Sequence, residues 1–320
     1  METVRFGIIG LGTIARKFAA ALALAEGVEL AAVAARDASR ADLFAKEFGA
    51  KRAYGSYLDL IRDANVDVVY IALTHNFHFE YAKLCVEAGK AVICEKPFFT
   101  NQAEAEVLVR LAQDTKVLMM EAMWTRCLPA FQQAKAWVKN RKIGEVKLIQ
   151  ASFSFNATSL GPSHRLFDPA LAGGSLWDAG VYPIEFATGI LDEKPTTVKG
   201  IARIGETGVD TQVAMLLGWD SGALATLSCG VTVKTSPDAY IYGTSGHIVV
   251  DNFLGTHMTE RYDAKGVLVE RFEEMFENGF VYQILHFAEL FRGKKTESDW
   301  IPLRDTVACA WIFDTLREQF

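Results

Sequence analysis

The sequence predicts an α/β protein with an N-terminal parallel-sheet domain and a C-terminal α+β domain that carries a mostly antiparallel open sheet. To about residue 120, short apolar runs alternate with helix-period segments, which indicates a parallel sheet with crossover helices. From about residue 128, alternating runs joined by turn residues are typical of an antiparallel sheet. The 320 residues suffice for two domains, which we place at 1–121 and 122–320 with a last helix that could pack back on the first domain.

The chain opens with an apolar strand over 4–9 that runs into a glycine turn and then a helix. Gly10 permits the tight turn, Gly12 lets the backbone approach a pyrophosphate, and Ala15 lets the helix pack closely on the strand. A second apolar run over 28–35 completes a βαβ unit. This order is the fingerprint of a Rossmann dinucleotide-binding domain, in which phosphates bind free N–H groups at a helix N-terminus.

Two arginines after the second strand favour NADP over NAD. An acidic residue there would hold a ribose 2′-hydroxyl, whereas Arg36 and Arg40 offer positive charge to a 2′-phosphate. The alternative is that both are solvated charges at the start of the next helix.

The other elements follow from hydrophobic periodicity and from capping residues and glycine stops. In the N-terminal domain we expect helices over 39–48, 56–62, 77–88 and 101–113, and strands over 66–73, 91–94 and 117–120. In the C-terminal domain we expect helices over 128–140, 175–190, 281–291 and 303–318. The expected strands there are 146–155, 198–204, 212–219, 223–233 and 240–250, the last broken at 243–246.

Composition excludes several classes of function. The formal net charge of −6 argues against nucleic acid and anionic membrane surfaces as partners. The five cysteines are scattered and odd in number, which argues against a zinc ribbon or a disulfide framework. His75 and His78 lack a third ligand, so we expect no metal. No leader pattern and no apolar run of ~18 residues is present, so we expect a cytoplasmic protein.

Two segments carry candidate catalytic residues. Lys96, in Glu95-Lys96-Pro97, follows the strand over 91–94, and ligands of open α/β sheets bind at the carboxyl ends of strands. Asp178 and Tyr182 are four residues apart and share one face if their segment is helical. The plainer alternatives are an exposed loop lysine and a capped helix with a core tyrosine.

These residue types suit the oxidation of an alcohol. Hydride transfer to a nicotinamide requires a base that takes the hydroxyl proton. A tyrosine, with its pKa near ~10, needs a nearby cation to serve as that base. Our hypothesis is that Tyr182 exchanges the proton, Lys96 lowers the pKa of Tyr182, and Asp178 holds Lys96 or a substrate hydroxyl. Lys96 as the direct proton donor is the alternative.

Several segments together resemble the glucose-fructose oxidoreductase / inositol dehydrogenase (Gfo/Idh/MocA) family over essentially the whole chain, and most of all its dimeric dihydrodiol dehydrogenase / NADP-dependent D-xylose dehydrogenase branch. The segments are Val33-Ala34-Ala35-Arg36-Asp37, Ala53-Tyr54-Gly55-Ser56-Tyr57, Cys94-Glu95-Lys96-Pro97, Met120-Glu121-Ala122, Trp124-Thr125-Arg126 and Glu206-Thr207-Gly208-Val209-Asp210. The resemblance implies that Lys96 contacts both the nicotinamide ribose and the substrate hydroxyl, and that the C-terminal sheet forms a homodimer. Tyr182 stands where many members carry a catalytic histidine, and His75 stands where the wider family has proline.

The fingerprint and the resemblance give one set of expected site residues. The catalytic residues are Lys96, Tyr182 and Asp178. The cofactor-binding residues are Gly10, Leu11, Gly12, Thr13, Ile14, Arg36, Arg40, Leu73, Thr74, His78, Glu95 and Lys96, and the substrate-binding residues are Trp124, Phe155, Arg165 and Trp177. We expect an NADP-dependent oxidoreductase that acts on a sugar, such as the aldose D-xylose, or on a trans-dihydrodiol. The alternative is a catalytically silent NADP-sensing regulatory protein of the same fold.

Overall fold

The computed structural model describes residues 2–320, which form two compact units. The first unit comprises the chain up to Phe99 together with Ala103–Trp124 and Asn278–Thr306. The second comprises Thr100–Gln102, Thr125–Glu277 and Val307–Phe320. A late segment of the chain therefore belongs to the first unit.

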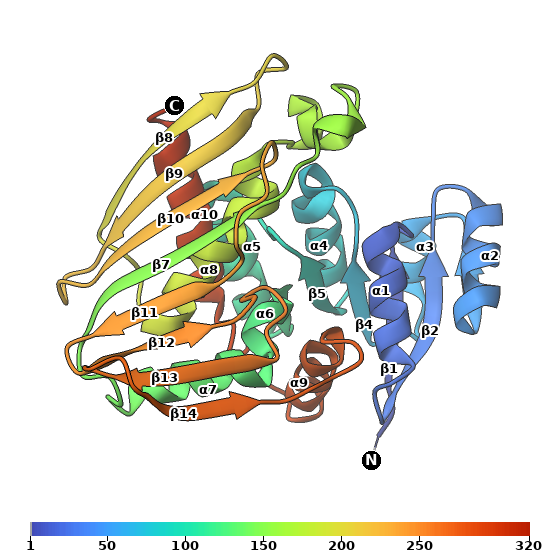
Figure 1. Cartoon of the computed structure of the whole chain (residues 1–320). Coiled ribbons are helices and arrows are strands. Elements are labelled where there is room, and N and C mark those ends of the chain that lie inside the picture. Colours follow the sequence, from blue (N-terminus) through green and yellow to red (C-terminus); the bar gives the residue numbers. More distant parts are fainter. Residues whose placement is uncertain (1) are drawn as a thin grey trace. The chain divides into compact units, whose positions relative to one another are not determined.

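A six-stranded sheet forms the centre of the first unit, with strand order β3-β2-β1-β4-β5-β6 (Figure 1). Every pair of neighbouring strands is parallel. The strands are β1 Val4–Ile9, β2 Val28–Ala34, β3 Arg52–Tyr54, β4 Val68–Ile71, β5 Ala91–Glu95 and β6 Met119–Ala122. This order is that of the doubly wound Rossmann sheet, so the predicted fold of the N-terminal part is confirmed.

Helices cover this sheet and begin close to the expected residues. They are α1 Thr13–Leu22, α2 Ala38–Phe48, α3 Tyr57–Arg62, α4 His78–Glu87, α5 Gln102–Thr115 and α9 Phe280–Arg292. The cap of α2 is Asp37, whose carboxylate accepts the Ser39 N–H, and α2 ends at Gly49 with φ of 72°. The helix α9 comes near the end of the chain and packs against the sheet of the first unit. Its residue Phe287 contacts Phe6 of β1, with ring centroids 6.3 Å apart.

The second unit contains an eight-stranded sheet of order β14-β13-β12-β11-β7-β10-β9-β8. Only the β7–β10 pair is parallel, so the expected mostly antiparallel sheet is confirmed. The strands are β7 Val146–Ser154, β8 Thr197–Ile204, β9 Asp210–Gly218, β10 Leu224–Gly230, β11 Ala239–Gly243, β12 Gly246–Val250, β13 Met258–Asp263 and β14 Leu268–Glu273. The strands β13 and β14, like the short β3 of the first unit, were not expected from the sequence.

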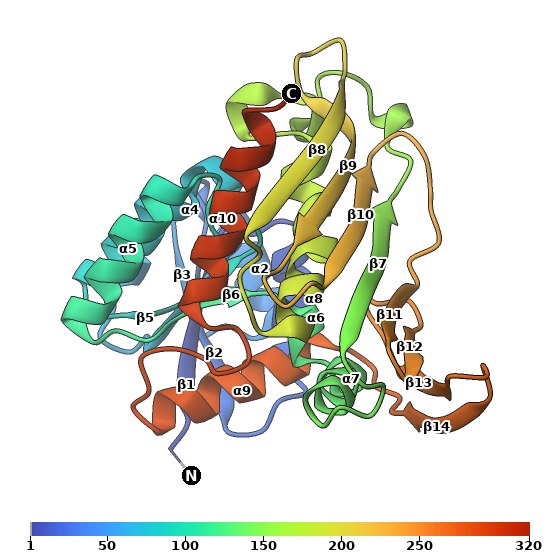
Figure 2. The ribbon, with the colours of Figure 1, turned by 90° about the vertical axis from the view of Figure 1, so that its left-hand side faces the viewer.

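The helices of the second unit lie on one face of this sheet and leave the other face bare, as Figure 2 shows for the described residues. They are α7 Pro129–Lys139, α8 Val181–Leu191 and α10 Leu303–Arg317, and the short α6 Trp124–Cys127 precedes α7 in the chain. Gly200 of β8 allows α10 to approach, because a Cβ there would lie 2.6 Å from Leu316 Cδ2.

The helix expected over 175–190 is interrupted. Leu176–Gly180 forms a π-helical turn, and regular α8 begins only at Val181. Asp210 fixes the start of this turn, since its carboxylate accepts the Ser175 hydroxyl at 2.7 Å and the Leu176 N–H at 2.6 Å. The turn places Asp178 and Tyr182 on consecutive helical segments of different pitch.

Candidate active site

The glycine turn has the geometry that a dinucleotide requires. Gly10 has φ of 85°, and a Cβ there would lie 2.7 Å from the Ala72 carbonyl oxygen. Gly12 caps α1, and the space where its Cβ would lie is open. The first turn of α1 contains no acidic side chain. The residues present therefore fit a pyrophosphate at the N-terminus of α1.

One of the two predicted arginines contacts this turn. Arg36 is exposed just after β2. Arg40 donates a hydrogen bond to the Leu11 carbonyl of the glycine turn at 3.4 Å. Two positively charged side chains therefore follow β2, at the strand end where a Rossmann fold binds the ribose.

His78 connects two loops at the carboxyl ends of β4 and β5. Its side chain is fully buried, and its ring nitrogens lie 2.9 Å from the Pro97 carbonyl and 3.1 Å from the Leu73 carbonyl. Burial lowers the pKa of His78. In the loop before His78, the Thr74 hydroxyl donates to Asn76 at 2.8 Å. His78 therefore holds in place the backbone of the two loops that carry Leu73 and Lys96.

Lys96 follows Glu95 at the end of β5 and precedes a cis peptide bond to Pro97. Glu95 is only 6% exposed, and its carboxylate accepts hydrogen bonds from the Tyr70 hydroxyl and, at 3.3 Å, from the Lys96 N–H. Burial raises the pKa of Glu95 to about 7. The catalytic candidate is thus attached to a buried acid that titrates close to neutral pH.

Trp124 lies at the start of α6, directly after β6, and its ring contacts Phe280 at a centroid distance of 5.1 Å. The Lys17 ammonium rests over both rings, 4.3 Å and 4.5 Å from their centroids. The predicted substrate-binding tryptophan therefore belongs to a cluster of two aromatic rings and a cation in the first unit.

In the second unit the structure brings together Arg165 and Asp178. Both terminal nitrogens of Arg165 lie 3.1 Å from Asp178 Oδ1. Arg165 starts a 3₁₀ turn, Arg165–Phe167, and Asp178 lies in the π-helical turn. A partly exposed carboxylate is therefore oriented by a guanidinium group.

Tyr182 stands in the first turn of α8 and is partly exposed. Its ring meets Phe153 edge to face at 5.4 Å, and Phe153 contacts Phe155 at 5.6 Å. The predicted proton-exchanging residue and the predicted substrate residue Phe155 thus share one aromatic cluster at the end of β7.

Trp177 has different surroundings. It is 9% exposed, and the Arg317 guanidinium of α10 lies 4.4 Å from its ring centroid. Within residues 2–320 its buried indole N–H has no hydrogen-bond partner. Trp177 is therefore mainly a packing residue between the π-helical turn and α10.

Three residues that shape these sites were not expected from the sequence. Tyr70 binds Glu95, Lys17 covers Trp124, and Asp210 anchors the segment that bears Asp178. For Tyr70, the only signal in the sequence was its hydroxyl, because a buried hydroxyl in an otherwise apolar strand requires a hydrogen-bond partner. Asp210 was part of a family segment, but nothing in its spacing indicated its role.

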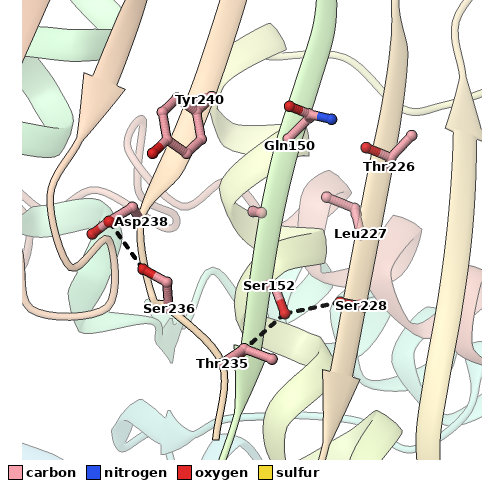
Figure 3. A pocket seen from close by; sticks show the side chains of 10 residues that line it. Gln150, Ser152, Thr226, Leu227, Ser228, Thr235, Ser236, Asp238 and Tyr240 are labelled. Carbon is pink, nitrogen blue, oxygen red and sulfur yellow. Dashed lines mark hydrogen bonds between the residues drawn. The ribbon is translucent and has the colours of Figure 1, made fainter.

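A hollow of about 520 Å³ opens on the sheet of the second unit (Figure 3). Hydroxyl groups dominate its lining, and Ser228 donates to Ser152 at 2.8 Å while Ser152 donates to Thr235 at 3.0 Å. Among residues 2–320, no group of three or more His, Cys, Asp or Glu side chains is placed to hold a metal, and no helix is long and apolar enough to cross a membrane.

Comparisons with known proteins agree with this geometry. Residues 4–123 match the model of the GFO_IDH_MocA oxidoreductase family with its NAD-binding Rossmann fold, and residues 131–249 match the GFO/IDH/MocA C-terminal domain. The chain is 34% identical over 323 residues to trans-1,2-dihydrobenzene-1,2-diol dehydrogenase of Mus musculus. This alignment covers 98% of this chain and 96% of the relative. The Homo sapiens enzyme of the same name is 34% identical over 324 residues with the same coverage.

Solved structures show the same fold. A 3-ketoreductase from Actinomadura kijaniata in complex with NADP and TDP-benzene superimposes with a TM-score of 0.88 at 26% identity, over 99% of this chain and 98% of that one. Levoglucosan dehydrogenase in complex with NADH and levoglucosan gives a TM-score of 0.90 at 20% identity, over 99% and 97% of the two chains. The second likeness supports the fold alone.

Proposed function

This chain belongs to the GFO/IDH/MocA oxidoreductase family, and we propose that it is an NADP-dependent enzyme that transfers a hydride between the nicotinamide and a hydroxyl or carbonyl carbon of a sugar or a trans-dihydrodiol. An aldose such as D-xylose represents the sugar class. The observation that carries the proposal is the Glu95-Lys96 segment at the carboxyl end of β5 in a chain that also presents a partly exposed Tyr182. The names of the relatives support the diol class.

The choice of NADP is supported by charge. Arg36 and Arg40 stand after β2, where an enzyme that prefers NAD would have an acidic residue. Gly10, Leu11, Gly12, Thr13 and Ile14 would hold the pyrophosphate from the turn and from α1. Leu73, Thr74 and Lys96 would contact the nicotinamide ribose, while buried His78 and Glu95 hold those loops in place.

In the proposed reaction, the cofactor and three side chains each have a separate role. When bound, the nicotinamide supplies the position that accepts or donates the hydride. Tyr182 exchanges the hydroxyl proton, and the positive charge of Lys96 favours the phenolate of Tyr182. Asp178, oriented by Arg165, binds a substrate hydroxyl.

Side chains near Tyr182 suit a small ligand with one apolar side. Phe155 would provide an apolar wall, and Arg165 would donate to a substrate oxygen. Trp124 of the first unit and Trp177 would be further substrate-binding residues. An apolar wall favours an aromatic diol, whereas Arg165 and Asp178 favour the hydroxyl groups of a sugar. Both classes therefore remain in the proposal.

A panel of aldoses, trans-diols and dicarbonyls, assayed with NADP(H) and with NAD(H), tests the proposal. We expect turnover with at least one class and a preference for NADP(H). Tyr182→Phe should lower kcat by about 10²-fold or more while NADP affinity is retained. The matched variant Tyr262→Phe, on β13, should keep normal turnover. NADP binding without any turnover would favour the regulatory alternative, and normal turnover of Tyr182→Phe would exclude the proposed role of this tyrosine.

The bare face of the eight-stranded sheet supports a further part of the proposal, a homodimer formed through this sheet. Ile201, Leu216 and Leu224 of β8, β9 and β10 are 74%, 57% and 56% exposed on it. Exposed apolar side chains gathered on one sheet favour contact with another protein surface.

A further inference from the structure

The carboxylate of Glu95 is buried next to Lys96 and is held from two sides. The Tyr70 hydroxyl donates to Oε1, and the Lys96 N–H donates to Oε2 at 3.3 Å. Tyr70 is fully buried, and its ring stacks on Phe18 of α1 with centroids 3.6 Å apart and planes 9° apart. The hydroxyl that holds Glu95 is therefore fixed between β4 and the helix that follows the glycine turn.

Several charged or titratable groups face Glu95. Lys17 on α1 and Lys96 at the end of β5 attract its negative charge, whereas Glu121 on β6 repels it. Buried Cys94 is the preceding residue of β5, and Tyr70 approaches from β4. Glu121 is itself held by the Phe98 N–H at 3.0 Å and the Thr306 hydroxyl at 3.0 Å. The negative charge of ionised Glu95 is therefore stabilised by Lys17 and Lys96 and opposed by Glu121.

We propose that Glu95 and Tyr70 form a positioning pair for Lys96, in which the ionised Glu95 carboxylate holds the Lys96 backbone and stabilises the Lys96 ammonium. This inference rests on the proposed function only where it concerns turnover. Neither side chain needs to touch substrate, since both act through Lys96.

The pair makes Lys96 sensitive to pH. Burial raises the pKa of Glu95 to about 7, so the carboxyl is largely protonated below that pH and largely ionised above it. When Glu95 gains its proton, Lys96 loses a negative neighbour and an ionic acceptor for its N–H. The Tyr70 hydrogen bond acts in the opposite direction to burial, because it lowers the pKa of Glu95. Removing this hydroxyl should therefore raise the pH at which Glu95 ionises.

A pH profile of kcat tests the proposal in the active enzyme. For the unmodified protein we expect kcat to fall on the acid side with a midpoint near the Glu95 pKa of about 7. Glu95→Gln keeps the size of the side chain but removes the charge and replaces one of its two acceptor oxygens by an amide donor, so kcat should be lower and this midpoint should disappear. Tyr70→Phe should move the midpoint to higher pH with little change in KM. Tyr54→Phe, which removes a comparable bond to Asp63 at 3.0 Å, should leave the profile unchanged.

Chemical labelling of Lys96 gives a readout that needs no turnover. The rate at which acetic anhydride modifies Lys96 at fixed pH, followed by mass spectrometry of its peptide, reports the unprotonated fraction of the amine. Loss of the neighbouring negative charge should lower the pKa of Lys96, so we expect Glu95→Gln to raise this rate severalfold above pH 7. The Tyr54→Phe variant should show the rate of the unmodified protein.

The two readouts separate this inference from the proposed function. If no substrate is turned over but Glu95→Gln accelerates labelling of Lys96, the positioning pair stands and the proposed function fails. If turnover is present, the pair is overturned when Glu95→Gln keeps the same acid-side midpoint or when Tyr70→Phe leaves it in place. Unchanged Lys96 labelling in folded Glu95→Gln protein would overturn it in either case.

Discussion

Among single residues, Arg36 should decide the choice of cofactor, because it is exposed just after β2, where a Rossmann fold binds the ribose. Arg36→Asp would set a negative charge against the 2′-phosphate of NADP, but a negative side chain there can accept a bond from the ribose 2′-hydroxyl of NAD. We expect the Kd for NADP to rise about tenfold or more, the equivalent of about 1.4 kcal/mol, while NAD binding is kept or improved. Fluorescence titration with each dinucleotide measures this change.

The control for the cofactor variant is Arg62→Asp, which changes an exposed charge at the last residue of α3. It should affect both dinucleotides little and equally. If Arg36→Asp left the preference for NADP unchanged, the charge beside β2 would not be what selects the cofactor.

The sequence could indicate residues whose roles depend on local chemistry. Gly10 is required by its own φ of 85°, and Lys96 is placed by the end of a strand. The bond between Arg165 and Asp178 could not be predicted, because a 3₁₀ turn and irregular backbone separate them. Tyr70 was missed because a tyrosine in an apolar strand is indistinguishable from a core residue until its partner Glu95 is known.

At the scale of elements, a regular hydrophobic period in the sequence was sufficient to predict helices and strands. Segments of irregular backbone could not be predicted in this way. The central strands and helices of the first unit begin and end within a few residues of the expected positions. The three-residue β3 is too short to show a pattern, and β14 has an almost wholly exposed run, so neither has a buried face to read. The π-helical turn at Leu176–Gly180 depends on the distant carboxylate of Asp210, which local sequence does not reveal.

A buried ion pair joins the short α6 to α8. Arg126 Nε lies 3.0 Å from Glu185 Oε2, and the two side chains are 0% and 1% exposed. The same guanidinium donates to the Glu185 carbonyl and the Thr188 hydroxyl, both at 2.9 Å. Arg126→Met would leave the Glu185 carboxylate buried without its counter-charge, so we expect a loss of about 3–5 kcal/mol in the free energy of unfolding. Urea denaturation measures it.

Two further variants make the test of this ion pair specific. Combining Arg126→Met with Glu185→Leu removes both charges and should recover much of the lost stability. Lys147→Met breaks the exposed pair with Glu145 and should cost less than about 1 kcal/mol. An Arg126→Met protein as stable as the unmodified one would show that the pair does not stabilise the contact between α6 and α8.

For the molecule as a whole, the change of pattern near residue 128 predicted two kinds of sheet, and both are present. Assignment of the late segment Asn278–Thr306 to the first unit depends on long-range packing, such as that of Phe287 on Phe6. An amphipathic helix shows that it has an apolar face but not which sheet that face will cover.

The bare face of the eight-stranded sheet leads to a prediction about assembly. Ile201 and Leu216 project from neighbouring strands β8 and β9 and are 74% and 57% exposed. If two copies of the 35.3 kDa chain associate through this face, a double Ile201→Lys, Leu216→Lys variant would bury like charges in the interface. Light scattering should show a dimer for the unmodified protein and a monomer for the variant. Leu43→Lys, at a 66% exposed position on α2, should remain dimeric. A double variant that stays dimeric would place the interface elsewhere.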